Sequence, residues 1–289
     1  MADVPEMVSH ASASGWVLTT FGSGRPWRPA LRRLKNQSRG LDRISARVLV
    51  SDRSLTSLCP GIATHKKFID ANSRGYGYWI WKPFILLSLM DSHPGAAGYI
   101  YIDAGCELNT TPKARERFNE YCNKAKSEGA LAFELPFSVA DWTHPSLIRR
   151  MDLSTHELGS QIAGGIIFLK NCQENRDLLN EWISIMIDFD YLYLTGDLPE
   201  SPFDVFPASW REHRHDQAIL TLLWKKRGLL TIPDESFWHP DWTKSGHDFP
   251  IWATRSKLRF SIRTTPLLLL PYRVLRKLLI LLSSNRIAI

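Results

Sequence analysis

The sequence predicts an α/β fold in which a mixed, mainly parallel, twisted sheet is flanked by helices. Three observations support this prediction. Short runs rich in β-branched and aromatic residues recur between longer segments with helical patterns. A predicted helix separates the first two runs, as in a parallel strand–helix–strand unit. A third run, Gly98–Ile102, ends in Asp103-Ala104-Gly105, at the strand end where open α/β sheets bind ligands.

The composition is that of a globular protein. The chain has 289 residues, 44% of them hydrophobic and 22% charged, so it can bury a full core. The eleven tryptophans either belong to that core or line a sugar or nucleotide cleft. The four cysteines include no Cys-x-x-Cys pair, which argues against a zinc site and a disulfide scaffold and fits reduced thiols in the cytoplasm.

The first elements are expected to form the strand–helix–strand unit. Gly15–Phe21 is predicted to be a strand, followed by a turn at Gly22-Ser23-Gly24. Within Arg25–Arg43 we interpret Ala30-Leu31-Arg32-Arg33-Leu34 as part of a solvated basic helix rather than a phosphate site. Ala46–Ser51 is predicted to be the second strand.

An aromatic cluster with one lysine precedes the strand that ends in Asp103. Residues 76–83 read YGYWIWKP, and Pro83–Met90 is predicted to be a buried helix with proline in its first turn. Lys82 has two interpretations. It can face a cleft and neutralise a diphosphate, or it can lie along the aromatic surface with its ammonium in water.

Asp103 is the main candidate for a ligand-binding group. A carboxylate at the end of a buried strand costs too much free energy to be buried idle. We therefore expect Asp103 to meet a metal, a ribose hydroxyl or a backbone donor.

The second half of the chain repeats the alternation. Helices are predicted at 111–127, at 175–188 and from Asp216, and strands at 131–135, 160–169 and 229–233. Gly164-Gly165 lets a bulky ligand approach the backbone, or it forms a β-bulge without function. Asp216-Gln217 begins a helix, where the aspartate can serve the helix dipole. The polar residues beside it favour a site instead: Arg211, His213, Arg214 and His215.

These motifs resemble bacterial nucleotide-sugar glycosyltransferases of the GT-A type. The resemblance rests on Gly-Tyr-Trp-x-Trp-Lys-Pro at residues 77–83, on Tyr-x-Asp-Ala-Gly-Cys-Glu at 101–107 and on Asp216-Gln217, and it covers roughly residues 14–250. In that fold a strand-end motif, usually Asp-x-Asp, holds a divalent cation and the sugar nucleotide. Here Gly105 stands in place of the second Asp.

The resemblance implies roles for individual residues. Asp103 and Asp216 would be the catalytic carboxylates, with Asp216 acting as the base in an inverting enzyme or holding the donor sugar in a retaining one. The donor, a UDP-sugar in the first instance, would contact Thr20, Phe21, Trp81, Lys82, Asp103, Ala104, Gly105, Gly164, Gly165 and Gln217. A divalent cation, Mn²⁺ or Mg²⁺, would be held by Asp103, His239 and His247.

Residues 255–289 are expected to form a basic tail. They contain eight Lys or Arg and no acidic residue, which leaves residues 1–254 with a net charge of −1 and argues against a nucleic-acid-binding core. The apolar run from Leu267 to Leu282 with Arg273, Arg276 and Lys277 predicts an amphipathic helix on an anionic membrane surface. The alternative is a helix packed on the core. We expect no membrane-spanning helix, because the apolar runs are too short.

We therefore predict a GT-A-type domain at 1–254 and an amphipathic tail at 255–289. It would transfer a sugar from a nucleotide diphosphate to a glycan or lipid-linked acceptor, in cell-surface polysaccharide synthesis at the inner face of the membrane. We expect no signal peptide. A nucleotidyltransferase is an alternative, although Gly22-Ser23-Gly24-Arg25 is a poor version of its phosphate loop. Gly105 favours another alternative, a non-catalytic sugar-nucleotide-binding protein.

Overall fold

The computed structural model describes residues 15–153, 158–199 and 201–285. Its strands are β1 (Trp16–Gly22), β2 (Ile44–Ser51), β3 (Gly98–Ile102), β4 (Glu107–Leu108), β5 (Ala130–Ser138), β6 (Ser160–Lys170), β7 (Thr231–Pro233) and β8 (Ile251–Trp252). The helices are α1 (Arg28–Ser38), α2 (Leu55–Leu58), α3 (Lys66–Ala71), α4 (Gly75–Tyr78), α5 (Trp81–Ser92), α6 (Pro112–Glu128), α7 (Pro145–Arg150), α8 (Gln173–Thr195), α9 (His215–Lys226), α10 (Trp242–Ser245) and α11 (Pro266–Asn285). Short 3₁₀ segments lie at Arg25–Trp27, Pro60–His65, Ala140–Trp142 and Gly246–Asp248.

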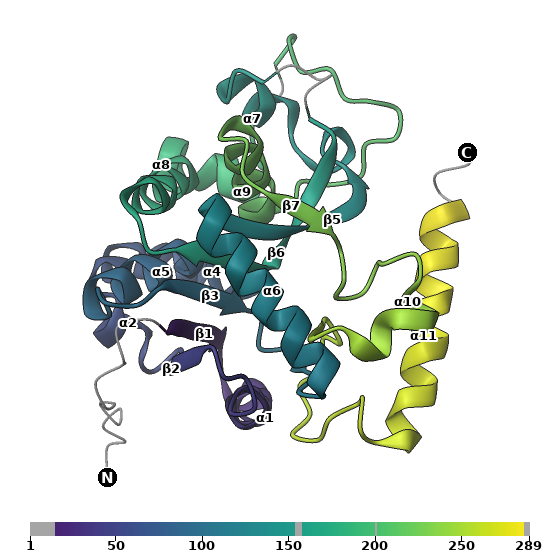
Figure 1. The fold of residues 1–289 in the computed structure, drawn as a ribbon. Coiled ribbons are helices and arrows are strands. Elements are labelled where there is room, and N and C mark those ends of the chain that lie inside the picture. The colour runs from purple at the N-terminus through teal and green to yellow at the C-terminus, as the bar shows by residue number, and fades with distance from the viewer. Residues whose placement is uncertain (1–14, 154–157, 200, 286–289) are drawn as a thin grey trace.

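The predicted mixed, mainly parallel sheet is confirmed. Six strands follow the order β2-β1-β3-β6-β5-β7 in the centre of the molecule (Figure 1). β1 is parallel to β2 and β3, and β5 is parallel to β7, whereas β6 is antiparallel to both of its neighbours. β4 and β8 form a separate antiparallel pair.

Helices cover both faces of this sheet. Alternate residues of β3 point to opposite sides: Tyr99 and Tyr101 pack with α5, α8 and α9, whereas Ile100 and Ile102 pack with α1 and α6. Because both faces are covered, all five residues of β3 are buried. The continuous apolar run that predicted this strand is thus explained by burial on both sides.

The paired glycines lie in the middle of β6 and not at its start. β6 begins at Ser160, and its pairing with β5 is irregular between Ala132 and Glu134, whose partners are Ile167 and Ile162. The intervening residues, Gly164 and Gly165 among them, are therefore out of register with β5. An irregularity of this kind redirects the side chains around it.

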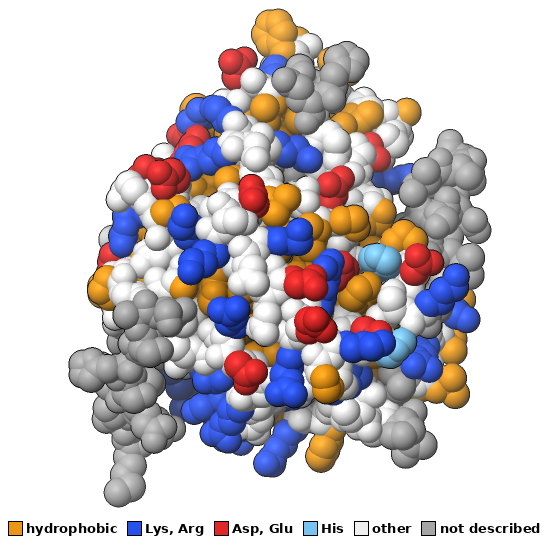
Figure 2. All heavy atoms as spheres, in the orientation of Figure 1, with side chains coloured by type: hydrophobic (Ala, Val, Ile, Leu, Met, Phe, Trp, Pro, Cys, Tyr) orange, Lys and Arg blue, Asp and Glu red, His pale blue; other side chains and the backbone are white. Residues whose placement is uncertain are grey.

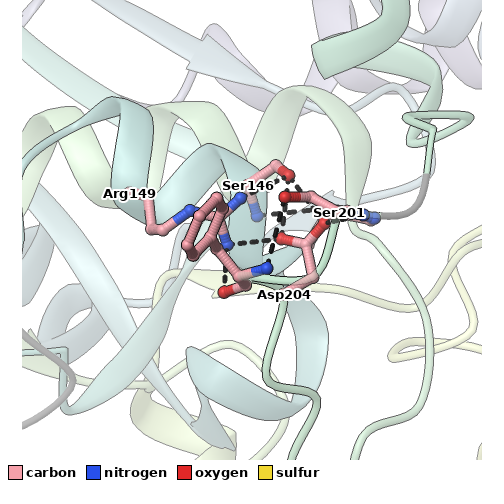
Figure 3. A network of polar contacts seen from close by, with 6 residues as sticks. Ser146, Arg149, Ser201 and Asp204 are labelled. Atoms are coloured by element: carbon pink, nitrogen blue, oxygen red, sulfur yellow. Dashed lines mark hydrogen bonds and ion pairs between the residues drawn. The ribbon is translucent and has the colours of Figure 1, made fainter.

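The long connection between α8 and α9 is held to α7 by one carboxylate. Asp204 accepts hydrogen bonds from the Ser146 hydroxyl at 2.8 Å and from the Ser201 amide at 3.1 Å, and it pairs with Arg149 at 2.5 Å (Figure 3). The Asp204 side chain is only 2% exposed, although the loop around it lies at the surface. This network orders a segment whose described residues form no helix or strand.

The residues after Thr254 pack on the body of the protein. Glu107, which is fully buried, accepts hydrogen bonds from the Ser261 hydroxyl and from the amides of Ile262 and Arg263. Farther along, α11 runs beside α10 (Figure 1), and its Tyr272 packs in an aromatic cluster with Phe237, Trp242, Phe249 and Trp252. The segment predicted as a separate tail therefore supplies buried residues, among them Ser256, Tyr272 and Arg276. No helix in the described part of the chain is long and apolar enough to cross a membrane.

Arg33 joins α1 to the turn after β3 and to the segment 256–258. The interpretation of its helix as solvated is wrong at this position, because Arg33 is 3% exposed. Its guanidinium donates to the carbonyls of Ala104 at 3.2 Å, Cys106 at 3.0 Å and Ser256 at 3.0 Å, and also to the carbonyl of Leu258. A buried charge is tolerated here because carbonyl oxygens surround it.

We predict that Arg33→Met lowers the free energy of unfolding by about 3 kcal/mol or more, because several buried carbonyls lose their donor. Urea denaturation followed by circular dichroism measures this change. Arg32→Met is the matched control, since Arg32 is exposed on the same helix. Equal stabilities of the two variants would contradict the structural role of Arg33.

Candidate functional site

A cavity of about 500 Å³ opens at the carboxyl ends of β1 and β3. This is the edge of the sheet at which the sequence predicted a ligand. It is enclosed by aromatic side chains, by the turn after β3 and by the glycines of β6. Its lining includes Phe21, Gly22, Tyr76, Trp79, Trp81, Tyr101, Asp103, Ala104, Gly105, Gly164, Gly165, Gln217, Phe237, Trp238 and Arg255.

Asp103 is the only acidic residue among the described residues that line the cavity. The Tyr101 hydroxyl donates to Oδ1 of Asp103 at 2.6 Å, and the Asp103 amide donates to the Gly165 carbonyl at 2.8 Å. Burial and the Asp103 charge raise the pKa of Tyr101 well above its ordinary value, so the phenol stays a neutral donor. One carboxylate oxygen thus accepts a hydrogen bond from a tyrosine side chain, a partner that was not among the three predicted for Asp103.

Gly164 and Gly165 make room for the side chains of the site. A Cβ at Gly165 would collide with the carboxylate of Asp103, and a Cβ at Gly164 would lie 3.0 Å from Cβ of Gln217. The absence of both side chains therefore lets Asp103 and the first turn of α9 approach β6 closely. The Gly-Gly pair was predicted to admit a ligand to the backbone. It lines the cavity, and it also sets the position of Asp103.

The aromatic wall begins with a left-handed turn. All residues from Gly75 to Trp79 have positive φ, between 52° and 83°, and the Trp79 amide bonds the Gly75 carbonyl at 3.2 Å. This conformation costs about 1–2 kcal/mol for each residue with a side chain. The turn places Tyr76 and Trp79 in the cavity lining, and Tyr76 and Trp81 pack on the ring of Phe21 with centroids 5.4 Å and 4.0 Å away. Strain of this kind is typical of ligand-binding segments.

Lys82 and Asp216 form a buried ion pair behind the cavity. Their side chains are 4% and 5% exposed, and Lys82 Nζ lies 2.7 Å from Asp216 Oδ2 and 2.9 Å from the Gly164 carbonyl. The structure thus agrees with neither interpretation of Lys82. The side chain does not line the cavity, and its ammonium is not in water. Asp216, predicted as a catalytic carboxylate, likewise does not line the cavity, whereas its neighbour Gln217 does. The pair ties α5, β6 and α9 together.

Several predicted site residues lie away from the cavity. Thr20 is fully buried and does not line the cavity. His239 and His247 do not line it either. His239 Nδ1 accepts from the Asp241 amide at 3.1 Å, and exposed His247 lies 3.4 Å from Asp248. The described residues contain no group of three or more His, Cys, Asp or Glu that could hold a metal. The trio Asp103, His239 and His247 does not form the predicted metal site.

The histidines beside Asp216 have structural partners. His213 is bonded to the Tyr193 carbonyl at 2.9 Å, and His215 to the Leu194 carbonyl at 3.0 Å. Burial lowers the pKa of His213 to about 3, so it is neutral at physiological pH. These side chains attach the start of α9 to the end of α8, and the dense polar cluster is mainly structural.

The sequence analysis missed Trp238 and Arg255 as lining residues. Both follow the last strand of the main sheet. Arg255 had been assigned to the tail because of its charge. The only sequence signal for these two residues is their place after a strand, because a cavity at a sheet edge is lined by residues from loops that follow several strands.

Several solved structures resemble this one, and two of them are described here. One is mouse xyloside xylosyltransferase 1 in its apo form, with a TM-score of 0.43 and 14% identity over 83% of this chain and 97% of that chain. The other is a glycosyltransferase involved in glycosylation of the major capsid of PBCV-1, with a TM-score of 0.37 and 11% identity over 69% of this chain and 81% of that chain. No protein-family model and no curated protein matches the chain.

We predict a pH dependence of stability that originates in Asp216. Burial raises its pKa to about 6 against the opposing Lys82 charge, compared with an ordinary value of 3.8. The folded protein therefore binds this proton more tightly than the unfolded chain does. The resulting stabilisation is complete at pH values below 3.8 and is lost as the pH rises through about 6.

Asp216→Asn removes this titration. Between these two pH values, the free energy of unfolding of the wild type should fall by about 2–3 kcal/mol relative to that of the variant. Urea denaturation at a series of pH values measures the difference. A difference that does not change with pH would show that Asp216 does not titrate with a raised pKa.

Proposed function

We propose that this protein is a GT-A-type glycosyltransferase that uses a nucleotide-diphosphate sugar. The observation that carries the proposal is the cavity at the carboxyl ends of β1 and β3, with Asp103 between an aromatic wall and two glycines. A cavity of about 500 Å³ is in the range of small-molecule and cofactor sites. Its aromatic side chains suit the flat faces of a base and a sugar, and its carboxylate suits hydroxyl groups.

The proposed reaction transfers a sugar from the diphosphate to a hydroxyl of a glycan or lipid-linked acceptor. The bond between the sugar and the diphosphate oxygen breaks, a bond to the acceptor oxygen forms, and a nucleoside diphosphate and a proton are released. Catalysis of this kind depends on positioning and on stabilising the leaving charge. Asp103 would contact the donor, with a UDP-sugar as the first candidate. This reaction fits a cytoplasmic enzyme of cell-surface polysaccharide synthesis.

Asp216 is assigned a positioning role. Its carboxylate is buried against Lys82, and the pair fixes Gly164 and the first turn of α9, from which Gln217 reaches the cavity. The nucleotidyltransferase alternative has less support. Arg25, the only basic residue of the glycine-containing loop after β1, is not among the described lining residues, although Gly22 and Ser23 are.

We predict that Asp103→Asn lowers sugar transfer by about 10²-fold or more, because a carboxylate that contacts the donor is neutralised. Asparagine still accepts the Tyr101 hydrogen bond, so the fold should be kept. The donor is first identified by a thermal-shift screen of nucleotide sugars, and turnover is then measured with an acceptor mixture. Asp70→Asn, at an exposed position, is the control. Near-normal turnover of the Asp103 variant would show that this cavity is not the donor site.

The exposed face of α11 supports association with a membrane surface. Leu270, Val274, Leu275, Leu278 and Leu279 are between 37% and 68% exposed, on a helix whose Arg273 and Lys277 are also exposed. Figure 2 shows apolar and basic side chains together along this edge of the molecule. Leucines beside basic residues fit the interface of an anionic bilayer. The side chains of residues 266–269 and 280–285 of the predicted apolar run lie outside the description.

We predict that Leu275→Glu/Leu278→Glu abolishes cosedimentation with vesicles that contain phosphatidylglycerol. Binding of the wild type should weaken as salt is raised. Phe203→Glu/Val205→Glu carries the same charge change on an exposed loop and is the control. Point variants are preferable to a cut after Thr254, which would remove the partners of Arg33 and Glu107. A wild type that ignores these vesicles at low salt would contradict membrane association.

A further inference from the structure

The main chain at Arg255 takes the place of a side chain at position 105. A Cβ at Gly105 would lie 3.0 Å from Cα of Arg255. The Gly105 carbonyl accepts from the Ser256 amide at 3.0 Å and from the Thr254 hydroxyl at 2.9 Å. The acidic turn after β3 is thus closed by the segment 254–256, and an aspartate at position 105 would displace it.

The conformation and position of Arg255 indicate a function for the closed turn. Its φ is 55°, an unfavourable conformation for a residue with a side chain, and the bonds of Thr254 and Ser256 hold it. The side chain is exposed and lines the cavity. It is the only lysine or arginine among the described lining residues, and no ion pair to it is present in the described part of the chain.

A diphosphate bound in the cavity would need a positively charged group beside it. A donor diphosphate would bring several negative charges to a cavity that already contains the Asp103 carboxylate. Lys82 is bonded to Asp216, and the described residues hold no cluster of metal ligands. A guanidinium binds phosphate oxygens through two parallel hydrogen bonds and can supply the missing positive charge.

We propose that Arg255 is the protein's counter-charge for the donor diphosphate, in place of a divalent cation held by a second carboxylate. This inference rests on the proposed function and deepens it. Binding of the diphosphate then requires no metal. The group that stabilises the leaving charge comes from a segment far in sequence from the acidic motif.

Isothermal titration calorimetry on the full chain tests the proposal. UDP, dTDP, GDP and ADP are titrated first, and the tightest ligand is compared with its nucleoside, which lacks the phosphates. Each titration is made in EDTA and in excess Mn²⁺ or Mg²⁺. We expect the dissociation constant of the diphosphate to be the same, within about 3-fold, in all three conditions, because Arg255 replaces the cation.

The variants separate charge from geometry. Arg255→Ala should weaken diphosphate binding by about 10-fold to 100-fold, the effect of losing hydrogen bonds to a charged group, and leave nucleoside binding unchanged. Arg255→Lys should be intermediate, because it keeps the charge and loses the paired geometry. Arg259→Ala removes an exposed arginine from the same segment and should change neither. Unchanged melting temperatures show that all variants fold.

The outcomes distinguish this inference from the proposed function. If the wild type binds a diphosphate only with metal, or if Arg255→Ala binds it normally, the inference is overturned and the proposed function stands. If nucleoside and diphosphate binding weaken equally in Arg255→Ala, the residue shapes the cavity and is not a counter-charge. If the wild type binds none of the four diphosphates, the proposed function fails, and the inference fails with it.

Discussion

The buried guanidinium of Arg33 is the interaction on which the candidate site depends. It lies on α1 and donates hydrogen bonds to carbonyls of two segments: Ala104 and Cys106 in the turn after β3, and Ser256 and Leu258 in the segment that closes this turn. These carbonyl oxygens accept most of the hydrogen bonds of the guanidinium, so both segments must stay in place for the charge to remain buried. The acidic turn and the segment that closes it are therefore held together.

A second buried cation organises the opposite side of the cavity. Lys82 joins α5 to Asp216 on α9 and to the Gly164 carbonyl on β6. Buried ion pairs contribute little net stability, but breaking one leaves an unpaired charge. The pair is therefore better understood as fixing the relative position of three elements than as a source of stability. The two glycines of β6 allow these elements to approach one another.

Close packing and strain both act on the cavity walls. The left-handed turn from Gly75 to Trp79 is unfavourable by itself, and the positive φ of Arg255 adds to that cost. Both conformations are tolerated because the large core on each face of the sheet supports the framework. The result is a cavity whose aromatic wall, carboxylate and guanidinium come from segments far apart in sequence.

The sequence by itself determined the layers of the fold and the place of the acidic residue in the candidate site. Strands buried on two faces, such as Gly98–Ile102, carry a local apolar signal, and Asp103 was identified because it follows such a strand. Only the tertiary structure decided which charged side chains pair with each other. Lys82 and Asp216 are 134 residues apart, so nothing local shows that they pair. The occupation of the space at Gly105 by Arg255 is likewise a long-range contact, 150 residues distant, that no periodicity records.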